Sequence, residues 1–135
     1  MRTDQDHEHG TIVASSVFPR SREAVRSARD WARRAYRLTG GAQAETCALL
    51  VSELATNAVE YAEGDQFEVI LWASPVSVGV RDGSPAVPEL RQPGQDDEHG
   101  RGLLLVAALS SRFEVVPVAG GGKVCRFWLD EGLPR

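Results

Sequence analysis

Residues 49–62 read LLVSELATNAVEYA and form the most informative stretch of the chain. Glu53 and Asn57 stand four positions apart in it, so on a helix they share one face, one turn apart. Their neighbours are mostly apolar, which indicates a largely buried helix that points a carboxylate and a carboxamide toward a common spot. A carboxylate can accept a proton, and an amide oxygen can bind a hard cation such as Mg²⁺. The pair therefore suggests phosphate chemistry, although this spacing is also typical of the solvated stripe of an amphipathic helix.

Length and composition indicate one globular domain. The 135 residues are 42% hydrophobic and 25% charged, which is ordinary for such a domain, and we expect a flexible tail over 1–10 and a single domain over 11–135. The formal net charge of −4 argues against a dedicated nucleic-acid-binding protein. No stretch approaches the roughly 18 consecutive apolar residues of a membrane helix, and residues 1–10 lack the apolar core of a signal peptide. These features predict a cytoplasmic protein without a membrane or nucleic-acid partner.

The metal-binding residue types are scattered along the chain. Cys47 and Cys125 each lie in an apolar pattern and show no paired metal-type spacing, so we expect two buried, reduced thiols. The histidines are too dispersed to predict a metal site.

The apolar periodicity predicts an α+β fold. Ser21 is the expected N-cap of a helix that ends near 38, and further helices are expected over 42–62 and 103–109. Strands are expected over 11–18, 67–73, 76–81, 112–118 and 123–129. Because hairpins join most strands and the helices are bunched between them, we expect a two-layer sandwich: one mainly antiparallel sheet with helices on one face. The stretch 82–102 is predicted to be a long loop, of the kind that forms lids or binding loops.

Two motifs follow the helix of Glu53 and Asn57. Asp82 ends a predicted strand, where its carboxylate can accept a hydrogen bond from an exocyclic amine, although Asp-Gly is also a common turn. The run Gly100-Arg101-Gly102-Leu103 precedes an apolar helix, where a helix N-terminus and a close backbone can receive a phosphate. The same glycines also suit a plain hinge. Gly120-Gly121-Gly122-Lys123 favours a hairpin over a phosphate loop.

These parts, in this order, resemble the ATP-binding domain of the histidine-kinase-like ATPases, the Bergerat fold. The chain looks most like their small anti-sigma-factor serine/threonine kinases, from about residue 12 to 130. The resemblance implies ATP and Mg²⁺ as ligands, phosphorylation of an antagonist protein, and binding of a sigma factor when that antagonist is absent. It also implies a homodimer that regulates transcription.

The resemblance assigns a role to each matching position. Asn57 would hold the Mg²⁺ that bridges the phosphates, and Glu53 would be the general base for an incoming hydroxyl. Asp82 would bind the amino group of adenine. Gly100, Arg101, Gly102 and Leu103 would cap the phosphates at the junction of the lid and the helix.

One position departs from the family pattern. Ser84, followed by Pro85, stands where the family commonly has a glycine beside the adenine. Three functions therefore stay open: a protein kinase that is also an anti-sigma factor, a non-catalytic regulator-binding module of the same fold, and a scaffold that uses the apolar face of the first helix, with Trp31 and Tyr36, as its contact surface.

Overall fold

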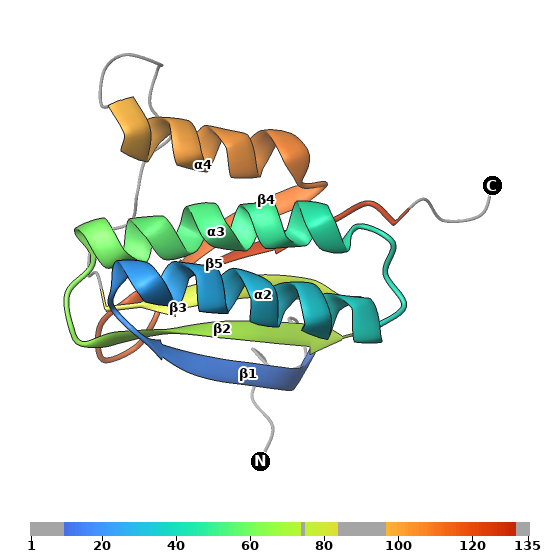
Figure 1. Ribbon diagram of the computed structural model, residues 1–135, viewed down its shortest axis with the longest axis horizontal. Helices are drawn as coiled ribbons and strands as arrows, with labels where there is room; N and C mark the ends of the chain where they lie inside the picture. The colour runs from blue at the N-terminus through green and yellow to red at the C-terminus, as the bar shows by residue number, and fades with distance from the viewer. Residues whose placement is uncertain (1–9, 74, 84–96, 132–135) are drawn as a thin grey trace.

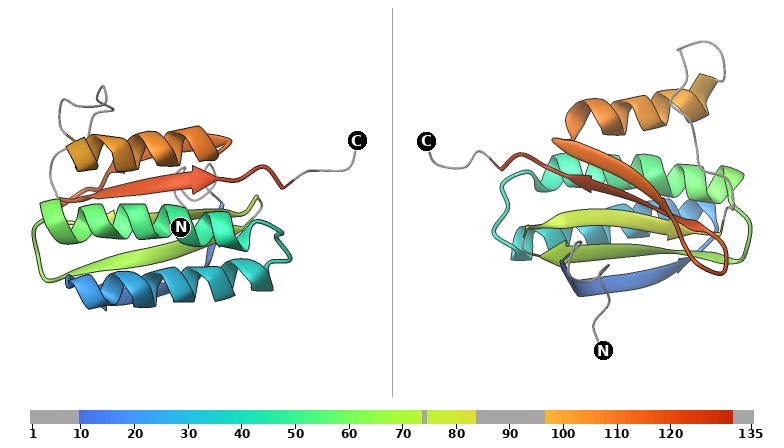
Figure 2. Two further views of the ribbon diagram at one scale, coloured as in Figure 1. Left: turned by 45° about the horizontal axis from the view of Figure 1, so that its top comes forward. Right: turned by 180° about the vertical axis from the view of Figure 1, so that it is seen from behind.

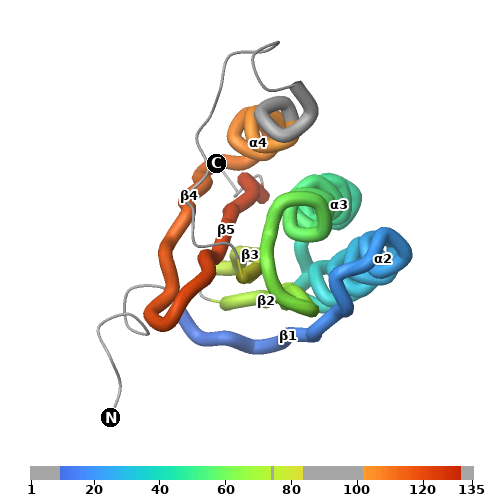
Figure 3. The backbone as a smooth tube through the Cα atoms, turned by 90° about the vertical axis from the view of Figure 1, so that its left-hand side faces the viewer, coloured from blue at the N-terminus to red at the C-terminus, as the bar shows by residue number. Residues whose placement is uncertain are grey.

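The computed structural model describes residues 10–73, 75–83 and 97–131, with the backbone alone described for 97–101. These residues form an antiparallel sheet of five strands with three helices on one face (Figure 1). The sheet curves around the central helix (Figure 3). The predicted α+β two-layer sandwich is confirmed.

The strands follow the predicted ranges to within one residue at each end. Their order across the sheet is β1-β2-β3-β5-β4, and every neighbouring pair is antiparallel. The register aligns Phe18 with Phe67 at one edge and Asp82 with Lys123 near the middle. The strands are β1 (Thr11–Pro19), β2 (Gln66–Ala73), β3 (Ser77–Asp82), β4 (Arg112–Pro117) and β5 (Lys123–Trp128).

The first helix, α2 (Arg22–Leu38), begins at its predicted cap, because Ser21 Oγ accepts a hydrogen bond from the N–H of Ala24 at 3.3 Å. Its apolar face points inward: Tyr36 is only 2% exposed and Trp31 packs partly buried against the core. The opposite face is basic and exposed. The apolar face of α2 is therefore used within the domain, which removes the main support for the scaffold reading.

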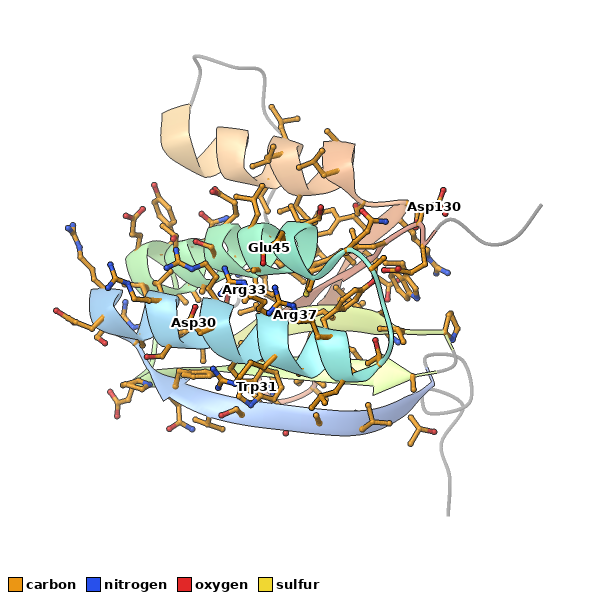
Figure 4. All side chains as sticks on the ribbon, turned by 45° about the vertical axis from the view of Figure 1, so that its right-hand side comes forward. Asp30, Trp31, Arg33, Arg37, Glu45 and Asp130 are labelled. Atoms are coloured by element: carbon orange, nitrogen blue, oxygen red, sulfur yellow. The ribbon has the colours of Figure 1, made fainter. Side chains whose placement is uncertain are left out.

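Arginines of α2 pair with acidic groups around them (Figure 4). Arg33 contacts Asp30 at 2.8 Å and Glu45, at the start of the next helix, at 3.1 Å. Arg37 contacts the same Glu45 at 2.9 Å. These pairs are largely exposed, so each adds little to stability, and they mainly fix how the two helices meet.

The central helix, α3 (Ala44–Tyr61), lies between α2 and α4 and over β3 (Figure 3). It is buried on several sides, as its apolar composition predicts. Leu50, Val51 and Leu54 are each at most 2% exposed, and burying such a side chain fully stabilises the fold by about 1.5–3 kcal/mol. The helix that carries Glu53 and Asn57 is thus firmly anchored in the core.

The last helix, α4 (Asp97–Leu109), begins earlier than predicted. The expectation of a helix that opens at Leu103, after the Gly-Arg-Gly run, is wrong. Glycine tolerates the helical conformation at a cost of about 1 kcal/mol relative to alanine. Leu103 and Val106 are buried in the core, and the helix they anchor extends back through the glycines. The predicted loop 82–102 is shortened accordingly, and its residues 84–96 lie outside the described residues.

The two cysteines are buried, free thiols, as predicted. Burial raises the pKa of Cys47 and that of Cys125 to about 12, so both stay protonated at neutral pH. Within the described ranges, no helix combines the length and apolar character that crossing a membrane requires.

Candidate functional site

Glu53 and Asn57 converge on one point of α4, the backbone of Gly102. A methyl group added to Gly102 would lie 3.0 Å from Oε1 of Glu53. The same methyl would lie 3.9 Å from both Nδ2 and Oδ1 of Asn57. The structure therefore brings these three sequence-predicted residues together, and the missing side chain of Gly102 lets Glu53 approach the backbone of α4.

Asn57 contributes a buried donor. Its Nδ2 is inaccessible to solvent and forms no hydrogen bond with any residue that the structure describes. Such a buried, unsatisfied group costs about 1–3 kcal/mol, so a native fold that keeps one usually has an acceptor for it. A ligand oxygen between α3 and α4 would be such an acceptor.

Glu53, one turn away, is half-buried. Burial raises the pKa of its carboxyl group above the ordinary value. The shift follows from the partial loss of water, which penalises the charged form. A carboxylate with a raised pKa is a stronger proton acceptor, which suits a general base near neutral pH.

Asp82, the last residue of β3, forms a buried ion pair. Both of its carboxylate oxygens accept hydrogen bonds from Nζ of Lys123, at 2.9 and 2.8 Å. Asp82 is 6% exposed and Lys123 is 8% exposed. The Asp-Gly dipeptide is therefore more than a turn, because its carboxylate is held in place by a residue from another strand.

Lys123 was missed as a site residue by the sequence reasoning, which read 120–123 as a hairpin. The hairpin is confirmed: Gly120, Gly121 and Gly122 have φ of 90°, 116° and 91°, values that favour glycine. The register of β3 and β5 places Lys123 directly opposite Asp82. An antiparallel pairing of the strand ending at 82 with the one starting at 123 was the signal that would have found it.

Two glycines without side chains let neighbouring backbone segments approach the end of β3 closely. A side chain on Gly83 would collide with the carbonyl oxygen of Glu63, just beyond α3. A side chain on Gly122 would collide with the carbonyl oxygen of Asp82 itself. The end of β3 is thus clamped between the end of α3 and the β4–β5 hairpin.

The two groups of residues lie at the same side of the molecule. In Figure 1 the end of α3, the end of β3, the start of β5 and the start of α4 all lie on the left. Figure 3 looks onto that side and shows the end of α3, the end of β3 and the start of β5 facing the viewer. The arrangement is compatible with a single site that spans α3, α4 and the β3–β5 pair.

The structure describes the predicted phosphate-capping residues to different extents. Gly100 and Arg101 lie in the first turns of α4, where only the backbone is described, and the side chain of Leu103 is 1% exposed in the core. Since the unpaired N–H groups of a helix belong to its first four residues, the positive end of α4 lies near Asp97. Ser84 is outside the described residues.

The donor set suits a metal that is shared with a ligand. No group of three or more His, Cys, Asp or Glu side chains able to hold a metal occurs in the described part of the chain. Mg²⁺ typically takes one or two protein oxygens and completes its shell with phosphate and water. Asn57, with Glu53 beside it, matches that pattern, and the unsatisfied amide of Asn57 fits a polar ligand at the same point.

The face of the sheet that no helix covers is seen in Figure 2 (right). It carries a separate hollow. It encloses about 510 Å³, is mostly apolar, and contains none of the predicted site residues. Arg126 lies in it, stacked 4.0 Å from Trp72 and 4.7 Å from Trp128, and donates a hydrogen bond to Ser77. Burial lowers the pKa of Arg126 to about 10. This internal stack explains the buried guanidinium without a ligand.

Comparison with known families identifies a domain family over most of the chain. Residues 18–128 match the family described as "Histidine kinase-like ATPase domain". The matched segment contains Glu53, Asn57, Asp82, Gly102 and Lys123. No curated protein matches the chain in sequence.

Proposed function

Because the chain belongs to the histidine kinase-like ATPase domain family, we propose that it binds ATP and transfers the γ-phosphate to a serine or threonine of an antagonist protein. The observation that carries the proposal is the buried Asn57 amide, which lacks a partner among the described residues and lies near Gly102, where Glu53 also converges. A phosphate oxygen would satisfy this donor.

Each site residue has a defined task in this proposal. Asn57, with its amide oxygen, holds the Mg²⁺ that neutralises charge on the phosphates. The hydroxyl oxygen of the serine or threonine bonds to the γ-phosphorus, and the bond from that phosphorus to the departing ADP oxygen breaks. Glu53 accepts the proton that the hydroxyl loses. Asp82 accepts a hydrogen bond from the amino group of adenine. The backbone of Gly100, Arg101, Gly102 and Leu103 approaches the phosphates at the start of α4.

The regulatory part of the proposal rests on the resemblance to anti-sigma-factor kinases. In this role the protein phosphorylates the antagonist, binds a sigma factor when the antagonist is absent, and thereby controls transcription in the cytoplasm as a homodimer. The exposed basic face of α2 offers a surface that suits an acidic partner.

The test combines binding and transfer. Titration calorimetry with ATP and Mg²⁺ measures binding, and labelled γ-phosphate measures transfer to an antagonist protein. We expect binding by the unaltered chain and by Glu53→Gln, but transfer only by the unaltered chain. Equal transfer by both proteins contradicts the general-base role, and absence of ATP binding contradicts the proposal as a whole.

A second candidate is a non-catalytic module of the same fold that binds a regulator. It is favoured by the Asp82 carboxylate, which is already bound at both oxygens by Lys123. In this case sigma-factor binding persists in Asn57→Ala without Mg²⁺, and no phosphate is transferred.

A further inference from the structure

We infer that Arg20 is a positioning residue for the proposed ATP site: its guanidinium holds the end of α3, which carries Asn57, and the turn that follows that helix. The inference rests on the proposed function, because the residue that Arg20 positions is the proposed Mg²⁺ ligand. Arg20 lies at the junction of β1 and α2. It acts through the backbone of α3 rather than by contact with the nucleotide.

The first support is a contact with two carbonyl groups. Nε of Arg20 donates a hydrogen bond to the carbonyl oxygen of Gly64 at 2.7 Å, and Nη1 donates one to the carbonyl oxygen of Val59 at 2.5 Å. The backbone N–H of Arg20 donates to the carbonyl oxygen of Asp65 at 2.9 Å. Hydrogen bonds from a charged donor are stronger than those between neutral groups. One residue therefore ties the last turn of α3, and the turn after it, to the start of α2.

The second support is what the end of α3 lacks. The last four carbonyl groups of a helix have no partner within it, and a nearby positive charge is favourable there. The last turn of α3 has no basic residue and contains Glu60. The C-cap, Ala62, is followed by Glu63 rather than by the glycine that often ends a helix. Arg20 thus supplies from another element the charge and the donors that α3 does not supply itself.

The third support is the place of Asn57 in the helix. It stands two residues before Val59 and four before Tyr61, at which α3 ends. Helix ends fray, and fraying is resisted least within the last turns. Glu53 lies one turn further from the end. Loss of the hold on Val59 should therefore displace Asn57 more than Glu53.

The turn that Arg20 holds also reaches Asp82. The carbonyl oxygen of Glu63 lies so close to Gly83 that a side chain on that glycine would collide with it. Gly83 directly follows Asp82. Figure 1 shows the end of β1, the start of α2, the end of α3 and the start of β2 together on the left. A single guanidinium therefore holds a segment that borders Asp82 as well as Asn57.

The test measures ATP binding and phosphate transfer by Arg20→Met, which keeps the apolar stem and removes the donors. Calorimetry with ATP and Mg²⁺ gives the dissociation constant, at a temperature at which circular dichroism shows every variant folded. We expect the dissociation constant to rise about ten- to a hundredfold, as a small displacement of a ligand-binding group predicts. At saturating ATP the rate of transfer to an antagonist protein should fall less, because Glu53 lies further from the helix end.

The conservative variant Arg20→Lys separates charge from geometry. A lysine keeps the positive charge near the end of α3, but its single ammonium lacks the planar fork of the guanidinium. We expect a dissociation constant between those of the unaltered chain and Arg20→Met.

Two control variants separate position from charge and from stability. Arg22→Met removes an exposed positive charge two residues away, and it should leave the dissociation constant of ATP unchanged. Tyr36→Phe removes a hydrogen bond to Glu131, whose other oxygen accepts from the N–H of Ala42, just before α3 begins, at 2.7 Å. This contact lies at the opposite end of α3, so Tyr36→Phe should lower the melting temperature without weakening ATP binding.

Four outcomes decide the inference. An unchanged dissociation constant in Arg20→Met overturns it and leaves the proposed function intact. Equal weakening in Arg20→Met and Tyr36→Phe also overturns it, because ATP binding then follows stability alone. Absence of ATP binding by the unaltered chain overturns the proposed function and this inference together. If Arg20→Met does not fold, Arg20→Lys decides: weaker ATP binding supports the inference, and unchanged binding overturns it.

Discussion

The two halves of the candidate site differ in how far the protein itself satisfies their polar groups. Between α3 and α4, Asn57 keeps a buried amide without a partner among the described residues, and Glu53 is a carboxylate whose pKa is raised by burial. Between β3 and β5, Asp82 and Lys123 bind each other at 2.8 and 2.9 Å. One half is unsatisfied without a ligand, whereas the other is organised before any ligand arrives.

The contrast separates two kinds of contribution. An unsatisfied buried donor reduces the stability of the fold and is useful only once a ligand accepts from it. A buried ion pair is stable while both partners are present and strongly destabilising when one is removed. Substitutions in the two halves should therefore change stability in opposite directions.

The largest effect is expected at the β3–β5 half. Asp82→Ala leaves the Lys123 ammonium buried without its partner, which should lower the free energy of unfolding by about 3–5 kcal/mol. Urea unfolding followed by circular dichroism measures this loss. The double substitution Asp82→Ala with Lys123→Met should recover much of it, and equal losses in the single and double variants would show that the pair is not coupled.

Asn57→Leu tests the other half and should have the opposite sign. Removing the unsatisfied amide should raise the free energy of unfolding by about 1–3 kcal/mol when no nucleotide is present. The same variant should lose the rise in melting temperature that ATP and Mg²⁺ give the unaltered chain, because a ligand raises the stability only of a folded protein that binds it. Thermal scans with and without nucleotide measure both effects, and a destabilised variant contradicts the unsatisfied-donor argument.

Gly102→Ala separates the stability of α4 from the function of the site. Alanine favours a helix over glycine by about 1 kcal/mol, whereas its methyl would lie 3.0 Å from Oε1 of Glu53 and push that side chain aside. We expect stability unchanged or raised by up to about 1 kcal/mol, with phosphate transfer reduced.

Ala108→Gly is the matched control for this change. Ala108 is exposed on the same helix, away from Glu53, so glycine there should cost about 1 kcal/mol and leave transfer unaffected. Equal phosphate transfer by Gly102→Ala and the unaltered chain would show that Gly102 is not part of the site.

The smallest expected effect is a pH dependence from Glu53. Its pKa is higher in the folded chain than in the unfolded chain, so the folded state binds the proton more tightly. This contribution to stability is complete below the unfolded pKa and is lost as the pH rises through the folded pKa. Glu53→Gln should therefore stabilise the domain relative to the unaltered chain at neutral pH, with the advantage shrinking in acid, as unfolding at several pH values will show.

The same shift predicts the pH dependence of transfer. If Glu53 is the base, phosphate transfer should fall in acid with a midpoint above the ordinary pKa of glutamate, about 4.3. Measuring the rate of transfer against pH gives the midpoint. A midpoint at or below the ordinary value contradicts a base that is partly removed from water.

Features that depend on near neighbours were predictable from the sequence. The strands, the helices α2 and α3, and the convergence of Glu53 with Asn57 follow from spacings of two, three and four residues. The start of α4 was not predictable in this way, because glycine permits several conformations and the packing of Leu103 and Val106 selects the helical one. The apolar side of α2 was visible as a sequence pattern, but the surface against which it packs was not.

The sequence by itself determined the α+β fold and the helix that carries Glu53 and Asn57, because covalent spacing along a helix or strand sets which side chains share a face. Only the tertiary structure decided that Lys123 holds Asp82 and that Gly102 faces Glu53. Asp82 and Lys123 are 41 positions apart, and their meeting depends on the register of β3 and β5. Register depends on which face of each strand the sheet buries and on the turns that join strands. No turn joins β3 to β5, because α4 and β4 lie between them in the chain.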